Sequence, residues 1–192
     1  MNMFRKLPHF VIINNEKFYI RTDFRIFIDF EKEMQGRDKK EACYNALNKF
    51  YPAFLEIVSK NLLDEAINKF LWFYKCGKSD AQINHSNKSN KNLRLYDYDY
   101  DSDIIWGAYY EQYRIDLSTV KLHWWKFRAM WNSLKSDCEF SKIRGYRAYT
   151  GKDKELLELK EQYKLPPTQF EIDEQKRRNE VFNQLNNMTS QK

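Results

Sequence analysis

Apolar residues at the start of the chain fall in short runs that polar residues interrupt. Residues 10–13 and 17–21 are rich in β-branched and aromatic side chains, and Asn14, Asn15 and Glu16 separate them. Strands favour such side chains, and asparagine tolerates the positive φ that a tight hairpin turn needs. The pattern therefore predicts an N-terminal β-hairpin.

A helical period follows the hairpin. Thr22 offers a side-chain oxygen for a helix N-cap, and Gly36 ends the pattern. The apolar residues between them share one helical face: Ile26, Phe27, Phe30 and Met34. The same period predicts helices over residues 39–50 and 52–74, the second with a break near Asn61.

A polar stretch over residues 77–92 separates two halves of the predicted domain. Gly77 marks the end of the preceding helix, and only Ala81 and Ile83 are apolar in the stretch. This composition predicts a flexible loop. Residues 93–100 then alternate leucine and tyrosine with polar residues, which favours a short extended segment.

Two aromatic helices are predicted next. Ser102 can cap a helix over residues 103–113, and Ser118 can cap one over residues 119–134. The second helix carries an apolar stripe at helical spacing, formed by Val120, Trp124, Phe127, Trp131 and Leu134. Aromatic residues at this spacing are usually core, so we expect the stripe to be buried.

The helix predicted over residues 119–134 has a second apolar face. This face carries Leu122, Trp125 and Ala129, with Lys121, Lys126 and Arg128 beside them. A helix that is apolar on two faces is either sandwiched within its own fold or offers one face to another chain. Both alternatives stay open, and the candidate partner-binding residues are Leu122, Trp125, Ala129, Lys126 and Arg128.

The C-terminal part ends in a charged tail. Residues 140–149 are ambiguous in secondary structure, and residues 153–163 predict an amphipathic helix before Pro166 and Pro167. The segment over residues 170–184 has few apolar residues, so we expect it to be mobile or to order against a partner. The predicted fold is mainly α: one helical domain over residues 1–165 with a small N-terminal β-hairpin, and a helical or disordered tail over residues 166–192.

Composition agrees with a globular core, because 42% of the residues are hydrophobic and 17% are aromatic. The net charge of +6 is unevenly spread: residues 96–120 carry six acidic and one basic side chain, and residues 121–151 carry two acidic and seven basic ones. These segments can pair with each other or steer a complementary partner.

Three cysteines in no close spacing argue against a disulfide framework and favour a reducing compartment. The N-terminal apolar run is too short for a signal peptide or a membrane span. We therefore expect a soluble protein of the cytosol without a membrane partner.

The sequence predicts no catalytic, metal or cofactor site. The alternating Asp97, Asp99, Asp101 and Asp103 invite a calcium-loop interpretation, but the required glycine and bidentate glutamate are missing in both registers. The three histidines and three cysteines do not have zinc-ligand spacing, and the chain lacks nucleophile-elbow, zinc-protease and phosphate-loop motifs. We therefore expect a protein that is not an enzyme.

Basic and aromatic residues of the same region could indicate nucleic-acid binding. The cations are Lys121, Lys126, Arg128, Lys142, Arg144 and Arg147, and the interleaved aromatics are Trp124, Trp125, Tyr146 and Tyr149. Cations can contact phosphates and aromatic rings can stack on bases. However, a core stripe accounts for the aromatic spacing, and the neighbouring acidic run would repel a phosphate backbone, so nucleic acid is disfavoured as a partner.

The motifs above resemble a phage protein family. The acidic tyrosine run over residues 96–103, followed by residues 106–117, 122–130 and 142–147, is similar to the bacteriophage gene-product-fifteen family of long-tailed phages of Gram-positive hosts. Residues 22–25 resemble the opening helix of the same family. The resemblance covers residues 7–165 and excludes the tail.

The resemblance implies a tail assembly chaperone in the host cytoplasm, without catalytic residues. Its implied partners are the tape-measure protein, which it would keep soluble, and the tail tube protein, which it would recruit. Self-association and an upstream chaperone partner stay open. The alternative function, based on the basic residues 121–147, is a virion structural or nucleic-acid-associated phage protein.

Overall fold

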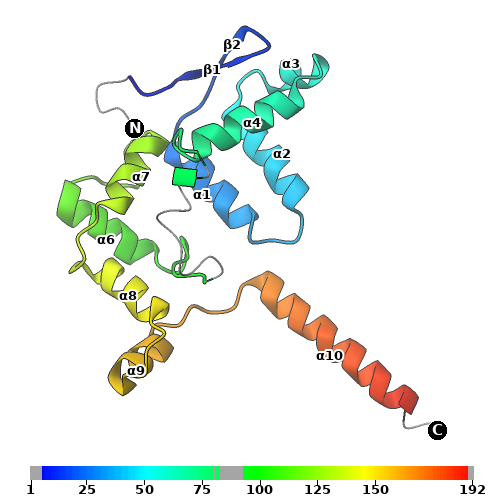
Figure 1. Cartoon of the computed structure of the whole chain (residues 1–192), viewed down its shortest axis with the longest axis vertical. Helices are drawn as coiled ribbons and strands as arrows, with labels where there is room; N and C mark the ends of the chain where they lie inside the picture. The colour runs from blue at the N-terminus through cyan, green and yellow to red at the C-terminus, as the bar shows by residue number, and fades with distance from the viewer. Residues whose placement is uncertain (1–5, 80, 83–92, 190–192) are drawn as a thin grey trace.

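Helices dominate the fold, and a two-stranded antiparallel hairpin stands at its N-terminal end (Figure 1). The computed structural model describes residues 6–79, 81–82 and 93–189. The elements are β1 (Phe10–Ile13), β2 (Glu16–Tyr19), α1 (Phe24–Glu33), α2 (Lys39–Phe50), α3 (Phe54–Ser59), α4 (Leu63–Tyr74), α6 (Ser102–Tyr113), α7 (Trp124–Asn132), α8 (Glu139–Ala148), α9 (Lys154–Gln162) and α10 (Gln169–Thr189). The predicted mainly helical fold with a small N-terminal hairpin is confirmed.

The hairpin forms where the sequence predicts it. Asn14 and Asn15 have φ angles of +47° and +61°, which is the left-handed conformation that asparagine tolerates in a tight turn. Val11, Ile13 and Phe18 are buried, so one face of the hairpin packs on the helical core. The turn is fixed by the Asn14 amide, which donates to a Glu65 carboxylate oxygen of α4 at 2.9 Å.

Helix α1 begins one residue later than its predicted cap implies. The Asp23 carboxylate accepts a hydrogen bond from the Arg25 amide at 3.0 Å, so Asp23 is the N-cap and the prediction of Thr22 was wrong. Thr22 is occupied by a long-range contact, because its carbonyl accepts from the Trp124 amide at 2.8 Å. Tertiary backbone pairing therefore decides which of two adjacent polar residues caps the helix.

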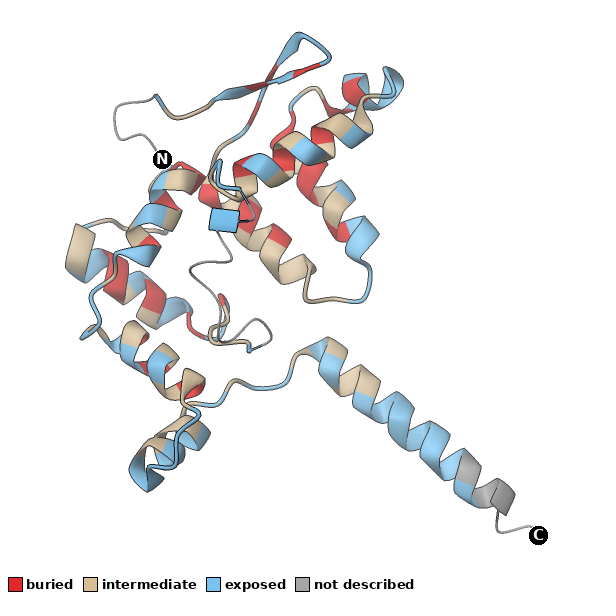
Figure 2. Ribbon diagram, in the orientation of Figure 1, coloured by how far each residue is buried: buried red, intermediate tan, exposed pale blue. Residues whose placement is uncertain are grey.

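Phe27 of α1 lies at the centre of the core and is fully buried. Its ring packs against rings from three other helices, with centroid distances of 5.8 Å to Phe50, 5.7 Å to Phe70, 5.4 Å to Phe73 and 4.9 Å to Trp124. In Figure 2, buried residues appear on α1, α2, α4 and α6. One aromatic cluster thus joins the N-terminal helices to α7.

The predicted break near Asn61 is confirmed. Asn61 has a φ of +56°, and the Leu62 amide donates to the Ile57 carbonyl at 3.0 Å, which closes the end of α3. Helix α4 ends in the same way: Cys76 and Gly77 have φ angles of +56° and +70°. Most of the predicted flexible loop that follows, residues 80 and 83–92, lies outside the described residues.

Helix α7 is shorter than predicted, because it begins at Trp124 instead of residue 119. The preceding residues are held in another conformation: the Phe24 amide donates to the Leu122 carbonyl at 3.0 Å, and the Arg25 guanidinium donates to the carbonyls of Leu117 and Val120 at 2.7 and 3.0 Å. Because these carbonyls are bonded to α1, the residues that carry them do not join the helix. Ser118 is accordingly not its cap.

The predicted stripe of the shortened helix is largely confirmed. Trp124, Phe127 and Trp131 are buried, while Val120 and Leu134 are partly buried and pack against the core. Two tyrosines of α6 attach the helix from one side: the Tyr109 hydroxyl donates to the Phe127 carbonyl and the Tyr113 hydroxyl to the Met130 carbonyl, at 2.7 and 2.8 Å.

Two further predictions around α6 were wrong. Ser102 is the first residue of α6, and its N-cap is Asp101, which makes no side-chain capping bond. Residues 93–97 have no regular secondary structure, and residues 98–101 form a turn instead of an extended segment. The Asp97 carboxylate organises this turn by accepting from the Asp99 and Tyr100 amides at 2.9 and 3.0 Å.

The C-terminal part consists of three helices. The ambiguous segment forms α8, and the predicted amphipathic helix forms α9, which the Asp153 carboxylate caps at the Leu156 amide. Helix α10 then projects away from the other helices (Figure 1), and its surface is exposed over most of its length (Figure 2).

Candidate interaction surface

The acidic tyrosine run over residues 96–103 is mainly a structural element. Two of its three tyrosines turn inward: the hydroxyls of Tyr96 and Tyr98 donate to the Glu31 carboxylate of α1 at 3.3 and 2.9 Å, while Tyr100 is exposed. The Tyr74 hydroxyl of α4 donates to the same carboxylate at 2.9 Å. Burial, reinforced by the Glu31 charge, raises the pKa of Tyr98 far above its ordinary value, so this hydroxyl stays a proton donor.

Arg128 of α7 completes the group around Glu31. Burial opposes its positive charge most strongly, but the Glu31 carboxylate together with Tyr96, Tyr98 and Tyr74 outweighs that effect, and the pKa of Arg128 is raised. Its guanidinium also lies 5.4 Å from the ring centre of Trp124. Arg128 is half-buried, and its guanidinium interacts with groups of its own chain; its assignment to a partner-binding face stays a prediction.

The acidic side chains of the run have separate structural partners. Asp101 forms a buried ion pair with Arg147 of α8, whose guanidinium nitrogens donate to its two carboxylate oxygens at 2.6 and 2.9 Å. Asp99 forms an exposed ion pair with Lys32 at 2.7 Å. The Asp101–Arg147 pair thus joins the acidic segment to the basic one, and Asp99 is paired with α1.

The other predicted partner-binding residues do not all lie on one surface. Leu122 is buried and precedes α7, so it does not share a helical face with Trp125 and Ala129. Ala129 and Lys126 are exposed, and Trp125 is half-buried. The part of the predicted face that reaches the surface is therefore Trp125 with Lys126 and Ala129.

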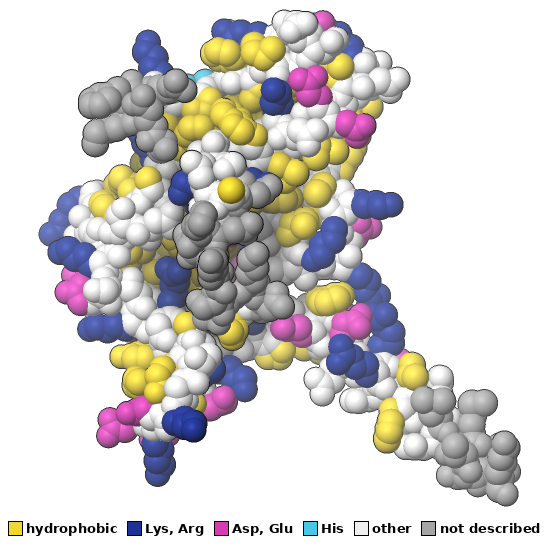
Figure 3. All heavy atoms as spheres, in the orientation of Figure 1, with side chains coloured by type: hydrophobic (Ala, Val, Ile, Leu, Met, Phe, Trp, Pro, Cys, Tyr) yellow, Lys and Arg dark blue, Asp and Glu magenta, His cyan; other side chains and the backbone are white. Residues whose placement is uncertain are grey.

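Trp125 meets a second tryptophan at the junction of α4 and α7. The rings of Trp72 and Trp125 have centroids 5.5 Å apart and an interplanar angle of 66°, an edge-to-face arrangement that aromatic pairs prefer. Trp72 retains 41% of its accessible surface. Hydrophobic side chains reach the surface in this part of the molecule in Figure 3. We call these two residues the tryptophan pair.

The tryptophan pair is held rigidly, because Trp125 also caps α4. Its indole nitrogen donates to the Phe73 carbonyl at 2.8 Å, and the indole nitrogen of the adjacent Trp124 donates to the Tyr74 carbonyl at 2.9 Å. These carbonyls belong to the last turn of α4, where helical partners are lacking. A Cβ atom on Gly77 would lie 3.1 Å from the Trp125 ring, so glycine lets the loop pass against the indole.

His123 orients the start of α7. Its Nδ1 accepts a hydrogen bond from the Trp125 amide at 3.1 Å, and its Nε2 lies 3.1 Å from the Pro8 carbonyl. This arrangement requires a neutral ring that donates through Nε2. Burial lowers the pKa of His123, which favours the neutral form. The sequence did not indicate this capping role.

Three exposed lysines lie near the tryptophan pair in sequence. Lys78 follows α4, and Lys121 and Lys126 lie before and within the first turn of α7; all three are exposed. Trp72 was missed because it lies off the apolar stripe of its helix, between the buried Phe70 and Phe73. A large aromatic residue between core positions was the available signal.

The basic and aromatic set considered for nucleic acid does not form one surface. Trp124 and Arg147 are buried, and Arg144 is largely enclosed, with its guanidinium 5.4 to 5.8 Å from the ring centres of Phe140, Trp131 and Tyr96. Lys121, Lys126 and Lys142 remain exposed. The set therefore divides between the core and the surface.

Across the described ranges, no group of three or more His, Cys, Asp or Glu side chains is placed to hold a metal ion. No helix among those residues has both the length and the apolar character that crossing a membrane requires.

Comparison with known proteins gives one match. The family model described as "Bacteriophage Gp15 protein" matches residues 3–166, which is most of the chain. Comparisons with curated proteins and with solved structures give no match. The matched residues include the tryptophan pair and end before α10.

Proposed function

Because this chain belongs to the bacteriophage Gp15 family, we propose that it is a tail assembly chaperone. In this role it binds the tape-measure protein of its phage, keeps that protein soluble and recruits tail tube subunits, without catalysis. The tryptophan pair is the observation that carries the proposal. It is a fixed and accessible aromatic surface on the body of the protein.

The geometry of the tryptophan pair suits an apolar face of a helix. Tryptophan is enriched among the residues that dominate binding energy, and a rigid side chain loses little conformational entropy on binding. Trp125 is fixed by its bond to the Phe73 carbonyl, and Trp72 packs against Trp125. Amphipathic helices commonly bind by laying apolar residues against such surfaces.

The three exposed lysines suit a partner helix with acidic residues beside its apolar face. Lys126 directly follows Trp125, and Lys78 and Lys121 lie within about six residues of the pair in sequence. Complementary charges at the rim of an interface increase the association rate and favour the correct partner. Binding through this surface should therefore weaken as salt concentration rises.

Co-expression with the tape-measure protein of the same phage tests the proposal. The wild-type chain should increase the soluble yield of the tape-measure protein and co-purify with it. Trp72→Ala should weaken the complex by about 30-fold, the effect of losing about 2 kcal/mol at a dominant interface residue. Trp106→Ala is a matched control, because Trp106 on α6 is 40% exposed and Trp72 is 41% exposed.

Lys126→Glu gives a second test that leaves both indoles in place. It should weaken binding and reduce its salt dependence, because an attractive rim charge is reversed. Failure of the wild-type chain to raise solubility or to co-purify would reject the chaperone function. Equal effects of Trp72→Ala and Trp106→Ala would reject the tryptophan pair as its site. Stable presence of the protein in purified virions would instead favour the structural alternative.

A further inference from the structure

Helix α10, which we call the arm, is a helix of 21 residues that stands away from the body (Figure 1). Near its base, Arg37 pairs with Glu174 at 3.7 Å, and the Arg94 guanidinium donates to the carbonyl of Pro166, which precedes the helix. Further along, Val181 and Phe182 are 51% and 63% exposed. The arm lies beyond residue 166, where the family match ends.

A solitary helix of this kind gains little from its own fold. Isolated helices are marginally stable in water, and most helices in proteins are stabilised by packing an apolar face. The arm leaves Val181 and Phe182 in solvent instead. Its exposed surface therefore needs a partner to become a stable element.

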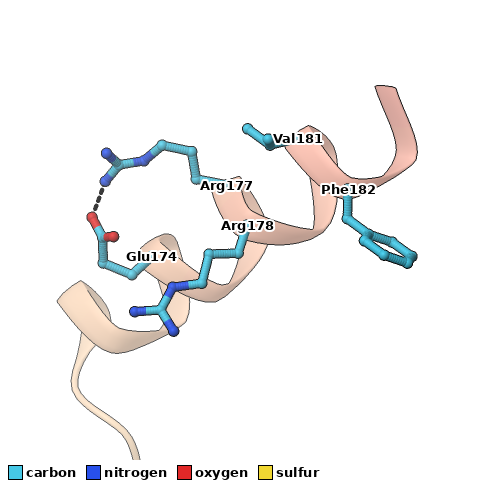
Figure 4. Close-up of a pocket in the computed structure, with 5 residues that line it drawn as sticks. All are labelled: Glu174, Arg177, Arg178, Val181 and Phe182. Atoms are coloured by element: carbon cyan, nitrogen blue, oxygen red, sulfur yellow. Dashed lines mark hydrogen bonds and ion pairs between the residues drawn. The ribbon is translucent and has the colours of Figure 1, made fainter. Parts of the chain in front are cut away.

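The arm carries a single mixed stripe. Phe170, Glu174, Arg178 and Val181 are spaced four, four and three residues apart, so they follow one face of the helix. An open hollow of about 350 Å³ lies on this face. In Figure 4, Glu174, Arg177 and Val181 lie along one edge of the hollow, and Arg178 and Phe182 lie along the other.

We propose that the arm pairs with the arm of a second copy of this chain in antiparallel orientation. The stripe runs apolar, acidic, basic, apolar, and in the opposite direction it runs apolar, basic, acidic, apolar. A two-fold pairing centred on Lys176 places Glu174 of each copy opposite Arg178 of the other. The same register places Phe170 of each copy opposite Phe182 of the other, beside Val181.

Charge selects the antiparallel orientation. In an in-register parallel pair, Glu174 would face Glu174 and Arg178 would face Arg178, and like charges repel. In the antiparallel pair, both contacts join Glu174 of one copy to Arg178 of the other. The two-fold axis makes this interface isologous. Glu174 can exchange its present partners at little cost, because its ion pairs with Arg177 and Arg37 lie at the surface, and such pairs are worth about 0–1 kcal/mol each.

The pairing is tested by sedimentation velocity of the full chain across micromolar concentrations. The wild-type chain should shift reversibly from monomer toward dimer. Glu174→Arg and Arg178→Glu should each weaken dimerisation by about tenfold or more, because each turns two attractive contacts into repulsive ones. The double variant E174R/R178E restores opposite charges and should return to within about threefold of the wild type.

Lys176→Glu provides the matched control. It changes the net charge by the same amount as Arg178→Glu but lies on the opposite face of the helix, so dimerisation should be nearly unchanged. Three results would overturn the proposal: a wild-type chain that stays monomeric, a dimer that neither single reversal weakens, or a double variant that is no better than the single ones.

Discussion

Replacing Asp101 with alanine should destabilise the protein strongly, although the residue belongs to a run that looks like an acidic surface. Asp101 and Arg147 are 3% and 5% exposed, and two hydrogen bonds of 2.6 and 2.9 Å join them. Arg147 also donates to the carbonyls of Leu95 and Tyr163 at 3.1 and 2.6 Å. The ion pair therefore joins the start of α6 to α8 and to the segments on either side.

The magnitude follows from what the substitution leaves behind. Asp101→Ala leaves a buried guanidinium without its counter-charge, which typically costs about 3–5 kcal/mol. The Asp97 amide also loses its acceptor, an Asp101 carboxylate oxygen at 2.9 Å, which adds about 1 kcal/mol. A total of about 4–6 kcal/mol is a large part of the 5–15 kcal/mol by which most domains are stable.

Urea unfolding followed by tryptophan fluorescence measures this difference. Asp99→Ala is the matched control within the same run, because its ion pair with Lys32 is exposed and should contribute at most about 1 kcal/mol. Replacing both members of the buried pair, as in D101L/R147M, should recover more than half of the loss. A loss of less than about 1 kcal/mol for Asp101→Ala would refute the assignment of this pair to the core.

Three further predictions concern the junctions around α7. The His123 pKa is lowered on folding, so its contribution to stability is present above the ordinary pKa of 6.5 and is lost as pH falls through the folded value; His123→Asn should flatten this dependence in unfolding curves measured from pH 8 to 5, while keeping a helix cap. Gly77→Ala should cost about 1–2 kcal/mol and shift the tryptophan emission, because a left-handed residue gains a Cβ that presses on Trp125. Phe27→Ala should cost about 3–5 kcal/mol in thermal unfolding, because its ring is fully buried among four others.

Local patterns in the sequence predict the elements better than their ends. The hairpin, the break at Asn61 and the buried Trp124, Phe127 and Trp131 depend on residues close in sequence, and all are confirmed. The hydroxyls of Thr22, Ser102 and Ser118 were equally local signals, but none of them caps a helix. At Thr22, pairing with a segment a hundred residues away in sequence decides the outcome.

At the candidate interaction surface, too, the sequence does not indicate what depends on tertiary contacts. The sequence leaves open whether the face with Trp125 and Lys126 is enclosed or accessible, and in the structure both residues keep solvent exposure. It fails to indicate the environment of Arg128, whose pKa is set by Glu31 and by tyrosines that only the fold brings near. It also fails for Trp72, which is recognised as part of the surface only after α4 and α7 are brought together.

The tryptophan pair and the arm are separate surfaces, and their proposed roles can be tested against each other. A dimer through the arm would present two tryptophan pairs, so a long helical partner with repeated sites would bind both with a gain from effective concentration. Glu174→Arg should then weaken binding to the full tape-measure protein but not to a short segment with one site. Trp72→Ala should weaken binding to both and leave sedimentation unchanged. If Glu174→Arg weakened binding to the short segment as strongly as to the full protein, the arm would itself contact the tape-measure protein, and the separation of the two surfaces would be wrong.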